Sequence, residues 1–420
     1  MKHRLVVLSL LLAAGLHADP ASTMDLTGYL GLVGKANLSL AAQRFNVPIA
    51  EAQVTIAKLF PEPQLSGGVG AFDIRFSGAP TTYDVAISQE IELGGKRRNR
   101  ARAAERAVVG AKDDLDDFVR TLRGQAADAY VDALAARLVL DRKQLTLDKL
   151  TQLVQRNEDS RRAGAIGDLP VIQAKVEAEK FRGDLLLAAG DVRKADLALG
   201  QLVGTAQAIT PSGNLKIAAR TFDAAKLIAD AKAGRPDVLS ARAALAAGNA
   251  KIDLAHSNIA IDPTLSIGWS HVTHATGSYA AEAPSPPADF LSANISIPLP
   301  FARREFKGEL ESALASRGQA EQQLRAAELK VEVEVQQALA TYQASIDRLK
   351  VYESGILDNA DKVLENTTYN FTHGGGTQLE VLDAARTVDE VYLDYYQALT
   401  DHVHALIAVE QAAGIWDVKL

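Results

Sequence analysis

Two halves of the chain repeat the same motifs in the same order. The segment Pro63–Gly68 (PQLSGG) recurs as Pro263–Gly268 (PTLSIG). Further along, Leu169, Val171 and Ala174 recur as Leu379, Val381 and Ala384. The separation between matching positions grows along the chain, as loop insertions in the second copy would cause, whereas chance matches would not keep their order. An ancient duplication therefore requires a fold built twice from one unit, and we expect repeats at residues 19–210 and 211–420.

The first residues have the order of a secretion signal. Lys2, His3 and Arg4 precede an apolar run over 5–16, and the small residue Ala18 follows. That run is too short to cross a bilayer as a helix, which takes about 20 residues. We expect residues 1–18 to be a cleaved signal peptide, with a retained anchor as the alternative.

Composition excludes several classes of protein. The chain has no cysteine, which excludes a disulfide framework, a cysteine nucleophile, a Cys-ligated metal and a lipidated cysteine. A formal net charge of −7 argues against nucleic-acid binding. With 47% hydrophobic but only 5% aromatic residues, the chain favours long helices that pack through small side chains.

Each half contains a pair of segments with the period of β-strands. Apolar residues alternate with polar residues over 83–93 and 291–299, the pattern of a strand with one apolar face. Their partners, 64–77 and 264–273, are rich in glycine, and a polar loop joins each pair. About ten residues is also the length of a tilted strand that crosses a bilayer.

Long helices follow each strand pair. From Arg97 to about Ser160 there is no proline, and apolar residues recur at spacings typical of a coiled-coil seam rich in alanine. A similar seam runs from Phe301 to about Thr372. Helices of roughly 60–70 residues would be about 90–105 Å long, which suits a tube better than a compact globule.

Four membrane strands cannot close a barrel alone. The smallest outer-membrane barrels have about eight strands, and open sheet edges are very costly in hydrocarbon. Two chains would supply about eight strands, which side chains would fill, and three would supply about twelve, which leave room for water. A conduit favours the trimer. A soluble helical bundle carrying two hairpins is the alternative.

Two segments, Asp237–Gly268 and Gly376–Ala384, resemble outer-membrane efflux proteins of the TolC family. The motif Ser88–Arg97 (SQEIELGGKR) is similar to the heavy-metal, CzcC-like subgroup. The resemblance covers nearly the whole chain after residue 18. It implies a mostly α fold with membrane β-structure, in which four strands per chain complete a 12-stranded transmembrane β-barrel in a homotrimer. It also implies a long α-helical coiled-coil barrel in the periplasm, with a periplasmic adaptor (membrane fusion protein) and an inner-membrane RND pump as partners.

By this resemblance, two glycine-rich turns are periplasmic tips that dock the adaptor. The tip residues are Gly164, Gly167, Asp168 and Leu169 in the first copy, and Gly374, Gly375, Gly376 and Leu379 in the second. Glycine allows the sharp reversal of the chain. The residues that we expect to pack the returning helices are Leu169, Val171, Ile172, Leu379, Val381 and Leu382. Simple turns without a partner are the alternative.

Two carboxylates next to the second tip match family positions that line the periplasmic entrance of the pore. Glu380 and Asp383 are one helical turn apart, so both can face one side. The first copy has Pro170 and Gln173 instead, so a trimer would carry two acidic rings, and a salt bridge between the copies is in doubt. Such rings suit cation selectivity and an electrostatic gate. A solvated helix face is the alternative.

Basic residues gather where strands give way to helices. The first run contains Lys96, Arg97, Arg98, Arg100 and Arg102, and the second contains Arg303, Arg304 and Lys307. Contact of Arg97, Arg98, Arg303 and Arg304 with phosphates of outer-membrane lipid is one interpretation. Solvated helix starts are the more common explanation.

Catalytic and metal-binding motifs are missing from the sequence. There is no GxSxG, GxxxxGK[ST] or HExxH motif. His271 and His274 need not share a face, and His402 and His404 should point to different sides of a helix. We therefore expect no enzyme activity, no cofactor and no dedicated metal site.

The sequence predicts the outer-membrane exit duct of a tripartite efflux system, located in the cell outer membrane with a long periplasmic extension. Divalent heavy-metal cations are the expected cargo. An exporter of drugs or small organic molecules is the alternative within the family, and a soluble periplasmic coiled-coil scaffold is the alternative from another class.

Overall fold

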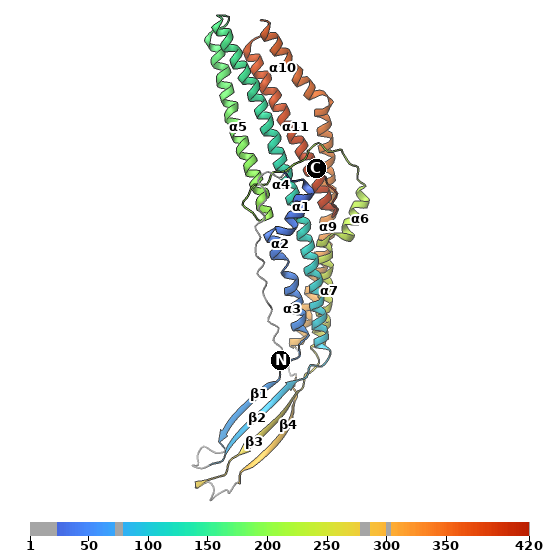
Figure 1. The fold of residues 1–420 in the computed structure, drawn as a ribbon. Coiled ribbons are helices and arrows are strands. Elements are labelled where there is room, and N and C mark those ends of the chain that lie inside the picture. Colours follow the sequence, from blue (N-terminus) through green and yellow to red (C-terminus); the bar gives the residue numbers. More distant parts are fainter. Residues whose placement is uncertain (1–22, 72–78, 278–285, 300–303, 420) are drawn as a thin grey trace.

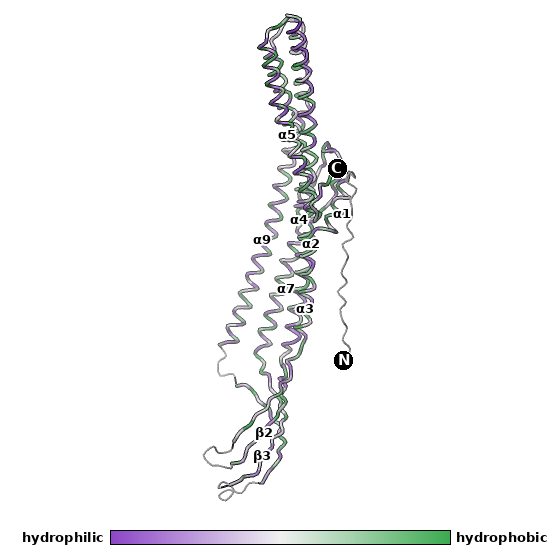
Figure 2. Tube along the Cα trace, turned by 60° about the vertical axis from the view of Figure 1, so that its left-hand side comes forward, coloured by the Kyte–Doolittle hydropathy of each residue, from purple (hydrophilic) through white to green (hydrophobic). Residues whose placement is uncertain are grey.

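The protein is long and narrow, with a sheet at one end and two helical tips at the other (Figures 1 and 2). The computed structural model describes residues 23–71, 79–277, 286–299 and 304–419. The expected signal peptide, residues 1–18, lies outside the described residues. No described helix combines the length and the apolar character needed to cross a membrane.

The two halves contain matching series of elements. The first half comprises α1 (Leu26–Ala36), α2 (Leu38–Gln43), α3 (Asn46–Ala57), β1 (Gln64–Ala71), β2 (Thr81–Glu90), α4 (Lys96–Arg162) and α5 (Asp168–Val203). The second comprises α6 (Ala224–Gly234), α7 (Pro236–Ser257), β3 (Thr264–Val272), β4 (Ala288–Ser296), α9 (Arg304–Val351), a π-helical turn (Tyr352–Ile356), α10 (Leu357–Thr372) and α11 (Gln378–Ala413). The predicted mostly helical fold with two strand pairs is confirmed, while the repeat boundaries 19–210 and 211–420 stay a prediction.

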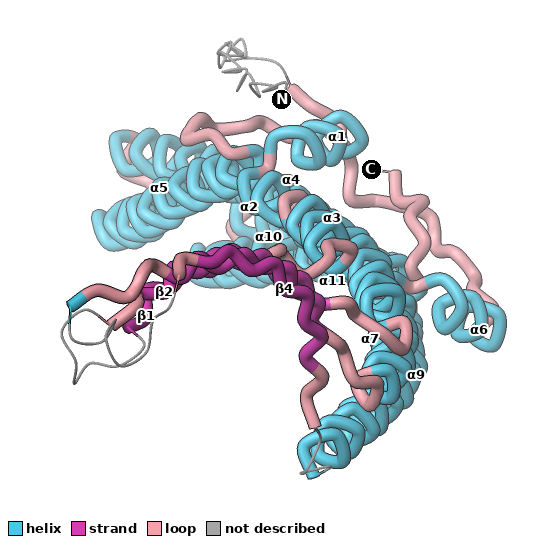
Figure 3. Tube along the Cα trace, turned by 90° about the horizontal axis from the view of Figure 1, so that it is seen from below, coloured by secondary structure: helices cyan, strands magenta, loops and turns pink. Residues whose placement is uncertain are grey.

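Four helical rows run from the sheet to the tips. Near the sheet, α3 packs on α4, α4 on α7, and α7 on α9. Nearer the tips, α5 packs on α4, α4 on α11, and α11 on α10. Seen from the sheet end, the rows form a curved wall, with α1 and α6 on its convex side (Figure 3). A wall of this curvature is an arc of a tube.

The longest helix is α4, with 67 residues and a length of about 100 Å. Gly95 precedes it and Gly164 follows it, and both have positive φ (76° and 75°) that L side chains rarely adopt. Between them, no proline interrupts the backbone hydrogen bonds. The predicted helix of 97–160 is therefore confirmed.

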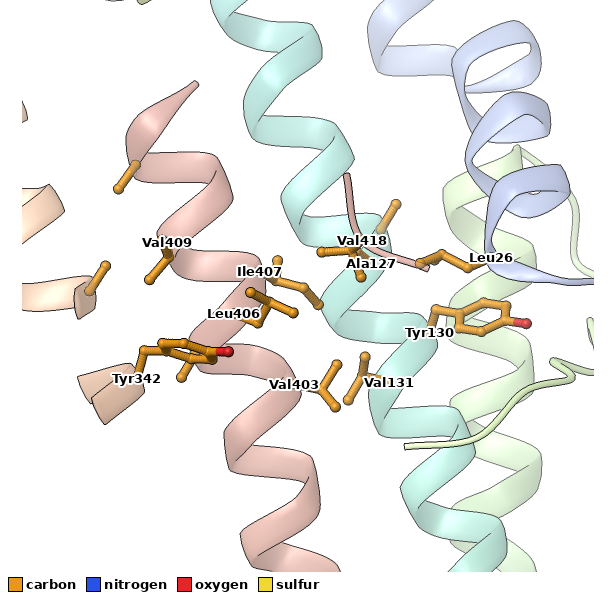
Figure 4. Close-up of a cluster of buried hydrophobic side chains, with 14 of the residues drawn as sticks. Leu26, Ala127, Tyr130, Val131, Tyr342, Val403, Leu406, Ile407, Val409 and Val418 are labelled. Carbon is orange, nitrogen blue, oxygen red and sulfur yellow. The ribbon is translucent and has the colours of Figure 1, made fainter. Parts of the chain in front are cut away.

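A buried core lies midway along the wall, where α1, α4, α9 and α11 meet (Figure 4). Tyr130 of α4 is fully buried, and its hydroxyl oxygen lies 2.6 Å from the main-chain oxygen of Met24 and 2.5 Å from that of Ser212, so that it can donate its one proton to either. Val131 of α4 packs in the same cluster as Val403 of α11. Of the alanines in the predicted seam, Ala126 and Ala133 are fully buried here, whereas Ala129 and Ala136 are partly buried.

The second long helix is interrupted, which the sequence pattern did not predict. We expected one seam from Phe301 to Thr372, but a π-helical turn over Tyr352–Ile356 separates α9 from α10. Gly355 has a φ of 124° within this turn, and such a backbone cannot continue an α-helix. Strand ends also differ, because β2 stops at Glu90 rather than at residue 93.

Candidate functional site

The four strands form one antiparallel sheet in the order β1-β2-β3-β4. The register aligns side chains of similar character across the four strands, in rows perpendicular to the strand direction. One row joins Leu65, Ile87, Ile267 and Ala293, and the next joins Gly67, Val85, Trp269 and Leu291. The opposite face carries rows such as Ser66, Ala86, Gly268 and Ser292, and Gln64, Ser88, Ser266 and Asn294. The sheet therefore has one apolar face and one face of small and polar side chains.

The apolar face is uncovered. Ile87, Ile267 and Leu291 are 52%, 59% and 82% exposed. At its far end, the Nδ1 atom of His271 lies 2.8 Å from the Oδ1 atom of Asp289, and Trp269 stacks on the His271 ring. An apolar band that ends in aromatic and polar residues is typical of strands in a lipid bilayer.

Both edges of the sheet are open in a single chain. Within the described residues, β1 pairs only with β2, and β4 pairs only with β3. Unpaired N–H and C=O groups are not tolerated in hydrocarbon. A sheet with this apolar face can therefore enter a bilayer only when other strands cover its edges.

The tip residues lie at the two turns farthest from the sheet (Figure 1). Gly164 and Gly374 have φ of 75° and 79° and end α4 and α10. Gly167 caps α5, whose first residue Asp168 accepts a hydrogen bond from Arg161 (2.9 Å). Gly375 donates its N–H to the carbonyl oxygen of Asn370 (2.9 Å), and Gly376 follows it. The positive φ at Gly164 and Gly374 explains why these turns need glycine.

Only some of the expected packing residues at the tips are buried. Val171, Val381 and Leu382 are buried, as expected. Leu169 (64% exposed), Ile172 (55%) and Leu379 (56%) are not, which corrects the expectation that they pack the returning helices. They lie on exposed faces of α5 and α11, whose buried faces carry Val171, Val381 and Leu382. Each tip thus presents apolar side chains to its surroundings.

The two predicted entrance carboxylates have different partners. Glu380 forms a capping box with Thr377, because its carboxylate accepts from the Thr377 N–H (3.0 Å) while the Thr377 hydroxyl accepts from the Glu380 N–H (3.4 Å). Asp383 accepts from Arg386 at 3.2 Å. Both carboxylates are exposed at the start of α11. Glu380 therefore starts its helix in addition to any role in a pore.

A salt bridge does join the two copies, at residues that sequence reasoning missed. Arg386 of α11 donates two hydrogen bonds to the buried carboxylate of Glu177 on α5. These hydrogen bonds hold the pKa of Glu177 below its usual range. The first copy forms this bridge through Glu177, about one helical turn after Gln173, rather than through Pro170 or Gln173 themselves.

A second buried ionic cluster links α4 and α11. Asp389 is 2% exposed and accepts from Lys143 (2.7 Å), Thr146 (2.8 Å) and Arg142 (3.4 Å). The Arg142 guanidinium also lies over the Tyr392 ring, 4.0 Å from its centre. The signal available in the sequence was a carboxylate within the apolar pattern of α11, which does not identify its partners on α4.

Beside this cluster, a groove of about 540 Å³ separates α4 from α10. Arg142, Lys149 and Arg156 line one wall, at successive heptad positions, and Asp361 and Glu365 line the other. The Tyr392 hydroxyl donates to Asp361 (2.6 Å) and ties α10 to α11. Opposite charges thus face each other across a gap near the tips.

The basic run at the start of α4 divides into two groups. Lys96 donates to Asp262 and to the Ala260 carbonyl (2.7 Å), and Arg100 binds Glu92 through two hydrogen bonds (2.6 and 3.1 Å). These two cations clamp the junction of sheet and helices, so the expectation of solvated helix starts is wrong for them. Arg97 instead lies over the ring of Phe60, and Arg98 is exposed. Arg303 lies outside the described residues, and Arg304 is the first residue of α9.

The two histidines of α11 contact different helices. His402 is buried, stacks on Tyr342 of α9 and lies 3.0 Å from the Ser345 hydroxyl, and burial lowers its pKa. The ring nitrogens of His404 lie 2.7 and 2.9 Å from Asp128 and Asp132 of α4. Burial alone would lower the pKa of His404, but the two carboxylates outweigh it and raise the pKa to about 9. In the described part of the chain, no group of three or more His, Asp or Glu side chains is arranged to hold a metal ion.

Comparison with known proteins agrees with this architecture. Residues 31–205 and 227–415 match the family described as "Outer membrane efflux protein". The cobalt-zinc-cadmium resistance protein CzcC of Cupriavidus metallidurans is 26% identical over 94% of this chain and 91% of its own length. The pyoverdine export outer membrane protein OpmQ of Pseudomonas aeruginosa is 26% identical over 91% of this chain and 83% of its own. A crystal structure of CusC superposes with a TM-score of 0.75 and 20% identity, covering 93% of this chain and 92% of that one. The chain belongs to the outer membrane efflux protein family.

Proposed function

We propose that the protein is the outer-membrane exit duct of a tripartite efflux system and acts as a homotrimer. The observation that carries the proposal is the four-stranded sheet with an uncovered apolar face and two open edges. Three copies would supply twelve strands, and the curved helical walls would continue as a tube of about 100 Å into the periplasm. The duct would be passive and need no catalytic residue, because an inner-membrane RND pump would supply the energy.

The proposed partners follow from the far end of the molecule. The tips expose Leu169 and Leu379 beside the turn glycines, which supports docking of a periplasmic adaptor there. Glu380 and Asp383 are exposed at the start of α11 and would form acidic rings at the entrance of the tube.

The mass of the detergent-extracted complex, corrected for bound detergent, tests the duct. We expect three chains, and carbonate washing of membranes should leave the protein in the pellet. A monomer that is stable without detergent, or release by carbonate, would instead indicate a soluble periplasmic scaffold.

Divalent heavy-metal cations are the cargo that we propose. The relation to CzcC and the acidic side chains at the tips support this assignment, while the equal identity to OpmQ keeps small organic molecules as the second candidate. Deletion of the gene should lower tolerance to zinc, cobalt or cadmium and leave drug tolerance unchanged. Unchanged metal tolerance with new sensitivity to organic compounds would reject the metal cargo and retain the duct.

A further inference from the structure

A basic pocket opens between α3 and α4, close to where the sheet ends. Its volume is about 500 Å³. The residues that line it are Lys58, Arg97, Arg98, Ala101, Arg102 and Glu105. Four cations thus face one carboxylate, an excess of positive charge that is unusual in a chain with a net charge of −7.

Part of this charge is not neutralised by the protein. Lys58 pairs with Glu105 (2.8 Å), and Arg102 lies 3.5 Å from Asp253. Arg97 stacks on the ring of Phe60, 3.7 Å from its centre. Among the described residues, neither Arg97 nor Arg98 has an ion pair. A ligand with negative charge would complete the pocket.

Exposed apolar side chains, here termed the apolar rim, flank Lys58 at the end of α3. Ile56, Leu59 and Phe60 are 56%, 58% and 66% exposed on the α3 side. The sheet begins a few residues away, since β2 ends at Glu90 and α4 begins at Lys96. Arg98 is in the first turn of α4 and Arg102 is about 9 Å from its start. Cations next to exposed apolar side chains, at the end of an apolar sheet face, suit the headgroup layer of a bilayer.

The pocket faces the outside of the wall rather than its concave side. Arg102 and Tyr130 are separated by a whole number of heptads, so they share a face of the supercoiled α4. Tyr130 is covered by the Met24 segment that leads into α1, and α1 lies on the convex side (Figure 3). A lipid could therefore reach the pocket without entering the tube.

We propose that this pocket binds the headgroup phosphate of an anionic phospholipid in the periplasm-facing leaflet. Arg98 and Arg102 would contact the phosphate, and the apolar rim would contact the start of the acyl chains. Arginine suits this role because its planar guanidinium donates two parallel hydrogen bonds to phosphate oxygens. The proposal rests on the membrane location given under the proposed function.

Native mass spectrometry of the detergent-extracted full chain would test this site. The probes are short-chain phosphatidylglycerol, short-chain phosphatidylcholine with the same acyl chains, and inorganic phosphate. We expect about one phosphatidylglycerol per chain, bound more tightly than phosphatidylcholine. The double variant Arg98→Gln/Arg102→Gln should weaken phosphatidylglycerol binding by roughly tenfold or more, since each interfacial cation contributes about fivefold. The control Arg182→Gln/Arg193→Gln removes the same charge from exposed positions on α5 and should bind as the wild type does.

Three results would overturn the proposal. These are equal binding by both double variants, equal affinity for the two lipids, and full displacement of the lipid by millimolar inorganic phosphate, which would indicate a site for soluble anions. Trimer mass and carbonate resistance of the Arg98→Gln/Arg102→Gln variant are measured in parallel. A variant that stays a membrane-bound trimer but loses the lipid supports the pocket, whereas a wild-type chain that carbonate releases rejects the duct itself.

Discussion

At the scale of single residues, the structure depends on charges buried between helices. Asp389 is the clearest case, because its buried carboxylate pairs with both Arg142 and Lys143 where α4 contacts α11. Removing one partner of such a cluster leaves an uncompensated buried charge. We expect Asp389→Ala to destabilise the protein by about 3–5 kcal/mol, measured as unfolding in detergent. Asp401→Ala, at an exposed ion pair with Arg348, should cost about 1 kcal/mol or less, and equal losses would contradict a special role for burial.

His404 makes the contact of α4 with α11 depend on pH. Its pKa is raised to about 9, so its charge favours the folded state most fully below the ordinary histidine pKa near 6.5. This contribution should decline as the pH rises through about 9. His404 also lines a groove between α9 and α11, where the charged neighbours Arg348 and Asp401 pair with each other.

The expected result is a thermal midpoint that falls between about pH 7 and pH 10 in the wild type. His404→Gln removes the titrating group and should flatten this part of the profile. A profile of the variant that parallels the wild type would assign the fall to other groups. His402 acts in the opposite direction. Burial disfavours its charged form, so its contribution to the stability of the folded protein should be lost as the pH falls below about 6.5.

At the scale of elements, replacement of glycine should have opposite effects on stability at two places in one helical row. Gly355 occupies the π-helical turn with a φ of 124°, where a side chain is strained although space is available. Gly318 lies inside α9, and a methyl group added there would meet no atom within 4 Å. Gly355→Ala should lower the stability by about 1–3 kcal/mol, while Gly318→Ala should raise it by about 0.5–1 kcal/mol. Thermal unfolding in detergent gives both signs, and equal stabilisation by the two changes would show that the turn can become regular helix.

The sequence predicted long helices well because their signals are repeated many times. The seam of α4 gives a residue such as Ala126 or Leu147 at every turn, and no proline competes with it. The interruption at Gly355 depends on one backbone angle, and a single glycine inside a helical pattern is usually tolerated. Strand segments were found from alternation, but their register and shared apolar face depend on pairing between distant segments, such as Ile87 with Ile267.

The site residues also divide into those that a sequence pattern identifies and those whose positions depend on packing between helices. The tip glycines were predictable because a sharp reversal between two helices requires a residue that accepts positive φ, as Gly164 and Gly374 do. The partners of Arg386 and Asp389 were not, because they lie on other helices whose rotation is set by packing. Glu380 had two compatible interpretations, a pore carboxylate and a helix cap, and only the geometry with Thr377 reveals the cap.

At the scale of the whole molecule, the charges at the tips would act together only in the assembled tube. Three copies would bring three Glu380 and three Asp383 carboxylates to one entrance, where each ring would attract cations and repel anions. The substitutions Glu380→Gln and Asp383→Asn remove this charge with little change of shape, and Gln at the third helical position preserves the capping box with Thr377. A change in ion selectivity therefore cannot be attributed to loss of the cap at the start of α11.

We expect the double variant to assemble as the wild type does and to have a lower preference for cations over anions in planar bilayers. A change of about 1 kcal/mol per ion would lower the permeability ratio about fivefold. The control Glu179→Gln/Asp191→Asn removes the same charge from exposed positions on α5, away from the start of α11, and should leave the reversal potential in a salt gradient unchanged. If both variants keep the wild-type reversal potential, these carboxylates do not line the conducting path, and the acidic rings at the entrance are rejected while the duct itself is not.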